Sequence, residues 1–161
     1  MNKGEKPRLV KRSQAEMLEL VLPHQANIFG NILGGQVMHY MDMCAAMAAY
    51  RHCRCPVVTA EVDRVVFCNP IKVGQMMILR ASVNYTHRTS MEIGVRVESE
   101  DPKTGIKKHT STAYLTFVAL DEDGKPTKIP PVLPETDKEE ERFKQAKIRR
   151  FERIEKRKRG L

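Results

Sequence analysis

The chain has 161 residues, of which 30% are charged and 41% hydrophobic, and its formal net charge is +8. This length allows one domain with a buried core, and the sequence contains neither an apolar run long enough to span a membrane nor a secretory leader. We therefore expect a soluble, cytoplasmic protein with no membrane partner.

The positive charge is concentrated at the two ends of the chain. Residues 1–12, a basic N-terminal arm, carry five Lys or Arg against one acid, and residues 135–161, a basic tail, carry eleven against seven. Residues 13–134, which we expect to form the domain, hold twelve of each. Basic ends attract phosphate-bearing partners, so binding of nucleic acid through the tail is one hypothesis. The neutral body, which has no aromatic residues interleaved with basic ones, argues against it.

The first predicted elements lead into one central helix. Residues 15–22 predict a strand that Pro23 ends, and residues 24–35 (HQANIFGNILGG) predict a loop. Residues 36–50 (QVMHYMDMCAAMAAY) predict a helix with almost no polar face. Because such a helix must be buried on most sides, the rest of the domain is expected to wrap around it.

After this helix the apolar pattern changes to period two, which predicts strands. Four strands are expected, at residues 57–68, 76–87, 91–99 and 109–120. Hairpin-like connections between them make an antiparallel sheet, so we predict an α+β fold in which the sheet curls round the helix. The segment 129–134 (IPPVLP) continues neither element. Thr136 or Asp137 is then expected to cap a basic C-terminal helix that ends near Arg159.

Asp42 is the only acidic residue in the predicted helix of residues 36–50. A carboxylate on a buried helix is costly unless it is paired or hydrogen-bonded. Asp42 therefore either lies on a solvated stripe or faces a cleft at a subunit junction, where it acts as a general base or a nucleophile.

Gly34 and Gly35 stand immediately before this helix. Glycines there let the backbone approach a ligand, and the free N–H groups of a helix start favour an oxyanion; a flexible turn is the alternative. Asn27 and Asn31 lie in the preceding loop. An amide side chain orients water or donates to an oxygen, but it also forms turns, and periodicity does not choose between these two residues.

The cysteines are Cys44, Cys53, Cys55 and Cys68. His52 beside Cys53 suggests half of a metal site, but no second half follows. We expect free thiols and no metal.

Several segments closely resemble the acyl-CoA thioesterases of the hotdog superfamily. The resemblance is carried by HQANIFGNILGGQVMHYMD (24–42), RHC (51–53) and VVTAEVDRVVFCNPI (57–71), with later segments at 85–101 and 132–150. It is closest to the bacterial acyl-CoA hydrolases and the cytosolic acyl-CoA hydrolases of animals. It implies a hotdog fold and the hydrolysis of acyl-CoA to a free fatty acid and coenzyme A without a cofactor.

The resemblance also implies the roles of particular residues. In this family an Asn before the Gly-Gly pair and an Asp on the helix form the active site, contributed by opposite subunits; here these are Asn27 and Asp42. Asp42 would activate water or attack the carbonyl, Asn27 would orient water or the carbonyl, and the backbone N–H of Gly35 would polarise the thioester oxygen. The implied assembly is a homo-oligomer, at least a dimer and commonly a hexamer of three dimers.

The anionic phosphates of coenzyme A need cations or N–H donors. The resemblance places Arg88, Thr89 and Ser90, which lie in a strand-connecting turn, near the nucleotide. The tail is a second candidate through Lys147, Arg149 and Arg150, although most of its charges suit a solvated helix face.

Two further questions stay open at this point. Met38, Met41 and Phe67 either line an acyl tunnel or belong to the ordinary core. A rival enzyme on the same fold, a hydratase or dehydratase acting on enoyl- or hydroxyacyl-CoA, would use a His and a carboxylate, and His39 lies three residues before Asp42 on one helix face.

Overall fold

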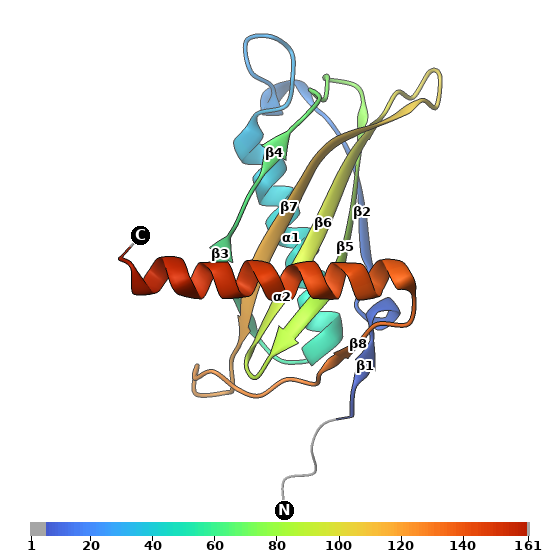
Figure 1. The fold of residues 1–161 in the computed structure, drawn as a ribbon. Helices are drawn as coiled ribbons and strands as arrows, with labels where there is room; N and C mark the ends of the chain where they lie inside the picture. The colour runs from blue at the N-terminus through green and yellow to red at the C-terminus, as the bar shows by residue number, and fades with distance from the viewer. Residues whose placement is uncertain (1–5, 161) are drawn as a thin grey trace, which may run out of the picture.

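The structure is a computed structural model that describes residues 6–160. A long helix lies against one face of a curled sheet, and a second helix crosses the opposite face (Figure 1). The elements in chain order are β1 (Arg8–Leu9), η1 (Val10–Arg12), β2 (Ala15–Leu20), η2 (Pro23–Gln25), α1 (Gly34–Cys53), β3 (Val57–Val62), β4 (Val66–Phe67), β5 (Met76–His87), β6 (Ser90–Glu100), β7 (Lys107–Ala119), β8 (Val132–Leu133) and α2 (Asp137–Lys158).

The main sheet has the strand order β2-β5-β6-β7-β3. The short strand β4 also pairs with β7, at Ser111 and Thr112, whereas β3 pairs with it from Leu115 to Ala119. Every pairing in it is antiparallel. The predicted α+β fold, with an antiparallel sheet round one central helix, is confirmed.

Small residues let α1 lie close to the sheet. Cys44, Ala45, Ala48 and Ala49 are completely buried, and they pack in one core with alternate residues of β5, β6 and β7. The expectation that α1 is buried on most sides is only partly met. One stripe of the helix stays uncovered in the single chain, with side chains 40–48% exposed at Met38, Met43, Met47 and Tyr50. Within the described residues, no helix combines the length and apolar character needed to cross a membrane.

The segment predicted as one strand at 57–68 forms two strands instead. β3 pairs with β7 through a register shift between Thr59 and Glu61 and ends at Val62, and β4 begins at Val66. The side chain of Asp63 forms an ion pair with Arg153 of α2 at 2.5 Å. Period-two patterning does not predict this break, because apolar and polar residues continue to alternate on both sides of it.

Two short strands tie the ends of the domain together. β1 pairs in parallel with β8, within the proline-rich segment where no element was expected. The backbone N–H of Arg8 donates to the carbonyl of Pro131 at 2.8 Å, so the proline supplies the acceptor that the pairing needs. Of the expected basic arm, residues 1–5 lie outside the described residues.

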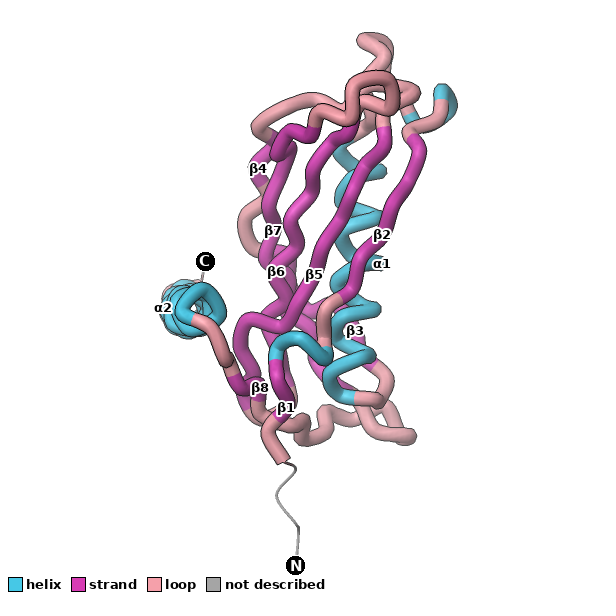
Figure 2. Tube along the Cα trace, turned by 90° about the vertical axis from the view of Figure 1, so that its right-hand side faces the viewer, coloured by secondary structure: helices cyan, strands magenta, loops and turns pink. Residues whose placement is uncertain are grey.

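Helix α2 crosses the outer face of the sheet, on the side away from α1 (Figure 2). Thr136 is its N-cap and accepts from the backbone N–H of Glu139 at 3.2 Å. Arg149 reaches down to Glu92 of β6, whose side chain is 1% exposed, at 2.7 Å. The guanidinium of Arg149 also lies 3.7 Å over the ring of Tyr114. The predicted surface helix is therefore fastened to its own chain by a buried carboxylate.

Candidate active site

Asn27 shapes the loop that leads into α1. Its side-chain Oδ1 accepts from the backbone N–H groups of Phe29 at 2.9 Å and Asn31 at 3.2 Å. The backbone N–H of Asn27 donates to the carbonyl of Asn31 at 2.7 Å. The side-chain oxygen of Asn27 thus stabilises the turn as an acceptor, and the NH₂ group is left to donate to a ligand. Gln25 fastens the loop to the helix by donating to Tyr40 at 2.8 Å.

The first turn of α1 is open. Leu33 is the N-cap and provides no side-chain acceptor, so the N–H groups of the first turn are not capped by a side chain. A Cβ built on Gly35 would have nothing within 4 Å, and one on Gly34 would lie 3.5 Å from the ring of Phe67. Space for a ligand therefore lies beside Gly35, at a helix start whose N–H groups favour a negative charge.

Asp42 lies eight residues beyond Gly34, about 12 Å along the helix axis. The carboxylate is half-buried, and its Oδ1 accepts a 2.6 Å hydrogen bond from the hydroxyl of Thr59 on β3. Asp42 stands one turn after Met38, within the uncovered apolar stripe. It is therefore an oriented carboxylate beside an exposed apolar surface, with Oδ2 left for water or substrate.

Sequence reasoning missed Thr59. The one signal available was a hydroxyl residue that follows two valines in the strand (VVTAEV), and polar residues are also common in edge strands. His39, the other candidate partner of Asp42, is exposed and contacts the ring of Tyr40 instead.

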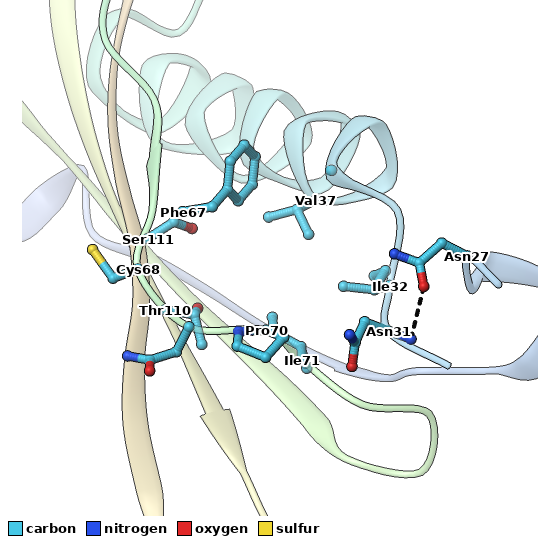
Figure 3. Close-up of a pocket in the computed structure, with 12 residues that line it drawn as sticks. Asn27, Asn31, Ile32, Val37, Phe67, Cys68, Pro70, Ile71, Thr110 and Ser111 are labelled. Carbon is cyan, nitrogen blue, oxygen red and sulfur yellow. Dashed lines mark hydrogen bonds between the residues drawn. The ribbon is translucent and has the colours of Figure 1, made fainter. Parts of the chain in front are cut away.

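A cavity of about 360 Å³ lies between the Asn27 loop, the start of α1 and the segment after β4 (Figure 3). Its lining residues are Asn27, Asn31, Ile32, Gly34, Val37, Phe67, Cys68, Asn69, Pro70, Ile71, Thr110 and Ser111. Asp42 does not line it. One chain alone therefore does not bring Asn27 and Asp42 into a common cavity.

The residues predicted to hold coenzyme A lie at the far end of the sheet. Arg88 and Thr89 form the turn between β5 and β6, and Ser90 begins β6. The other end of β5 follows a turn in which the backbone N–H of Val73 donates to the carbonyl of Gly30 in the Asn27 loop. The twelve residues of β5 separate the two ends by about 40 Å. Within one chain the predicted nucleotide site and Asn27 are not brought together.

The tail offers fewer free cations than its sequence suggests. Arg149 is engaged by Glu92, and Arg150 donates to Nδ1 of His87 at 3.0 Å. Burial lowers the pKa of His87, and the neighbouring cations Arg150 and Arg88 lower it further. Of the three tail residues considered for coenzyme A, Lys147 is the one without such a contact among the described residues.

The apolar candidates separate into three environments. Met41 is 1% exposed and belongs to the core, Met38 lies on the uncovered stripe of α1, and Phe67 is half exposed and lines the cavity.

The four cysteines are free thiols in the structure. Burial, with a smaller contribution from Glu16, raises the pKa of Cys44 to about 11, which keeps it an unreactive thiol. In the part of the chain that the structure describes, no group of three or more His, Cys, Asp or Glu side chains is arranged to hold a metal.

Comparison with known proteins assigns the family. The family model of the Thioesterase superfamily matches residues 29–106. A Bacillus subtilis protein named as an uncharacterized acyl-CoA thioester hydrolase, YkhA, is 39% identical over 132 residues, which cover 82% of this chain and 77% of that protein. The crystal structure of an acyl-CoA hydrolase from Bacillus cereus superposes with a TM-score of 0.92 at 33% identity, covering 96% of this chain and 94% of that one. The chain belongs to the thioesterase superfamily, and the predicted hotdog fold is confirmed.

Other relatives differ in length and assembly. Acyl-coenzyme A thioesterase 11 of mouse is 36% identical over 147 residues, but this chain spans only 25% of its length. A structure described as an apo-hexameric acyl-CoA thioesterase superposes with a TM-score of 0.91 at 39% identity, over 94% of this chain and 97% of that one.

Proposed function

We propose that the chain is an acyl-CoA thioesterase that hydrolyses acyl-CoA to a free fatty acid and coenzyme A. The observation that carries this proposal is the carboxylate of Asp42, fixed by Thr59 at 2.6 Å beside an uncovered apolar surface. An acyl chain needs the apolar surface, and a thioester needs both a base or nucleophile and a donor to its oxygen. The names of the relatives support the same substrate class.

In the proposed mechanism each group has one task. Oδ2 of Asp42 removes a proton from a water that attacks the carbonyl carbon, the C–S bond breaks, and the leaving thiolate of coenzyme A takes up that proton. In the alternative, Oδ2 attacks the carbonyl carbon and expels the thiolate, and water then hydrolyses the resulting anhydride to the free acid and Asp42. In both, Thr59 keeps the carboxylate in place. The backbone N–H of Gly35, from the copy of the chain that supplies Asn27, donates to the carbonyl oxygen as it becomes negative. The NH₂ group of Asn27 donates to that oxygen or to the water, since its carbonyl is occupied by the turn.

A complete site needs two copies of the chain. Asn27 lines the cavity and Asp42 does not, which supports a site in which the Asn27 that serves one Asp42 comes from a second copy. The stripe at Met38, Met43 and Met47 and the edge strand β3 offer an apolar surface for that copy. Relatives whose structures are described as hexameric support an assembly of three such dimers.

Relatives from Staphylococcus aureus support both the residue types and the substrate. One structure is described as an acyl-CoA hydrolase in complex with butyryl coenzyme A and coenzyme A, at a TM-score of 0.89 and 34% identity. Three others are variants in which an Asp, an Asn and a Thr are each replaced by Ala. We infer that Arg88, Thr89 and Ser90 hold the nucleotide of a coenzyme A bound mainly by another copy, that no cofactor or nucleic acid takes part, and that the enzyme works in the cytoplasm.

A thiol-release assay over saturated acyl-CoAs tests the proposal. The wild type should release coenzyme A, Asp42→Ala and Asn27→Ala should lose most of the turnover, and Asn31→Ala should serve as the matched loop control. Mixing the two inactive variants should restore part of the activity through hybrid dimers, which hold one intact site. Full turnover in Asp42→Ala would remove the mechanism. With a hydroxyacyl-CoA as the substrate, formation of an enoyl product by loss of water, without thiol release, would favour the hydratase or dehydratase instead.

A further inference from the structure

The cavity beside Asn27 is lined entirely by uncharged residues. Its twelve lining residues include no Lys, Arg, His, Asp or Glu. The phosphates of coenzyme A have no cation there, and a charged acyl group such as a succinyl carboxylate would lose its hydration without gaining a partner. The cavity therefore suits the neutral, acyl half of the substrate.

Ser111 gives this cavity a second property. Its side chain is completely buried, and its hydroxyl has no hydrogen-bond partner among the described residues. A buried hydroxyl without a partner is costly, so it marks a place where a ligand can supply one. Figure 3 shows Ser111 on the β7 wall of the cavity, on the same side as Phe67.

Ser111 faces the interior because of its position in β7. It alternates with Ala113 and Leu115, which are 0% and 1% exposed and pack against α1 in the core. At the end of β7 nearest the Asn27 loop this inward row meets the cavity rather than the body of α1. The chain thus places one hydroxyl in an interior row that is otherwise apolar at these positions.

We propose that this cavity receives the acyl chain of the substrate and that Ser111 selects acyl groups that carry an uncharged oxygen, a hydroxyl or an oxo group. The proposal rests on the thioesterase function proposed above and narrows its substrate class. The hydroxyl of Ser111 donates to an oxo oxygen, or donates to or accepts from a hydroxyl. A carboxylate on the acyl chain is excluded, since no cation lines the cavity.

The test compares kcat/KM for thiol release from acyl-CoAs of similar length. The substrates are butanoyl-CoA, 3-hydroxybutanoyl-CoA, 4-hydroxybutanoyl-CoA, acetoacetyl-CoA and succinyl-CoA. For at least one uncharged oxygenated chain, the wild type should exceed the rate for butanoyl-CoA by about five- to tenfold, as one neutral hydrogen bond allows. Succinyl-CoA should be slower than butanoyl-CoA by about a hundredfold.

The Ser111→Ala variant should lose this preference, so that the ratio of oxygenated to plain substrate falls to about one. Thr116→Val is the matched control, because Thr116 has the other unpartnered hydroxyl of β7 but lies five residues on, on the opposite face of the strand. That variant should keep the wild-type ratio, and circular dichroism should show both variants folded.

The outcomes separate this proposal from the general function. Thiol release with no preference in the wild type, an unchanged ratio in Ser111→Ala, or rapid hydrolysis of succinyl-CoA would overturn the proposal for Ser111 and leave the thioesterase function intact. No thiol release from any acyl-CoA would overturn both.

Discussion

The hydroxyl of Thr59 donates to Oδ1 of Asp42 at 2.6 Å and so joins the edge strand β3 to the central helix α1. Thr59 stands where the pairing of β3 with β7 shifts register, before Glu61. A bulge of this kind bends the strand and changes the direction of a side chain, and such bulges are frequent beside active sites. Thr59 itself is still in register with the buried Phe117, so the carboxylate is oriented by the last regularly paired residue before this irregularity.

Replacing Thr59 with Val removes the hydrogen bond and leaves a side chain of similar shape. We expect kcat to fall by about 10- to 100-fold, since a hydrogen bond to a charged group contributes about 1.5–3 kcal/mol. KM should change little, because Thr59 positions the reacting carboxylate and does not bind coenzyme A. Steady-state thiol release measures both constants. Thr59→Ser keeps the hydroxyl and should keep most of the rate; a fully active Val variant would show that Asp42 needs no such support.

Asn27 is expected to have two separable roles, one for each end of its amide. Asn27→Asp keeps an oxygen that accepts from the N–H groups of Phe29 and Asn31 but loses the NH₂ donor. Its melting temperature should therefore match the wild type, while thiol release is lost. Asn27→Ala should lose both, with a destabilisation of about 1 kcal/mol from the missing turn hydrogen bonds. If Asn27→Asp were as active as the wild type, the donor role of the amide would be wrong.

Much of the fold follows directly from local patterns. The strand predicted at 76–87 has the observed bounds of β5, and the helix predicted at 36–50 lies within α1. Period-two patterning works there because one face of the sheet is buried against α1. It fails at 57–68, where β3 ends at Val62 and the side chain of the next residue, Asp63, pairs with Arg153 of α2. That partner lies 90 residues away in the sequence and leaves no local trace.

The candidate site shows the same limit. The Gly-Gly pair and Asp42 are visible in the sequence because each departs from its surroundings. Thr59 and Ser111 are not visible in this way, because each is an ordinary polar residue within a strand. Thr59 matters because the fold places it beside Asp42, and Ser111 matters because the fold gives its hydroxyl no partner. The basic tail shows the opposite error. Its sequence suggests more free cations than the fold leaves, because it does not show that Arg149 is paired with Glu92.

Removing Glu92 should loosen α2. Its side chain is 1% exposed and contacts Arg149 at 2.7 Å and Arg153 at 3.4 Å. Glu92→Ala leaves both cations without this partner, and we expect a loss of about 3–5 kcal/mol in the free energy of unfolding. Denaturant titration measures it. The control is Glu155→Ala, which removes an exposed pair with Lys158 and should cost less than about 1 kcal/mol. Equal effects of the two variants would contradict the anchoring role.

His87 should make stability depend on pH. Burial, and then Arg150 and Arg88, lower its pKa below the ordinary value of 6.5, so the folded state binds this proton less readily than the unfolded chain. The stabilising contribution is therefore complete above pH 6.5 and is lost as the pH falls through the folded pKa. Between about pH 7.5 and pH 5 the melting temperature of the wild type should fall more than that of His87→Gln, which cannot titrate there. Identical pH profiles would contradict this.

Met47 tests the requirement for a second copy. Its side chain is 40% exposed on the uncovered stripe of α1, and a lysine there would have to be buried without a partner if two chains pack through this surface. Met47→Lys should therefore be monomeric by sedimentation, folded by circular dichroism, and without thiol release. Phe151→Lys, at a side chain 66% exposed on α2, is the matched control and should keep the dimer and its activity. A monomeric Met47→Lys protein with full activity would show that one chain forms the whole site. A variant that still assembles would place the contact between copies on another surface, and the partner that supplies Asn27 would then have to approach Asp42 from elsewhere.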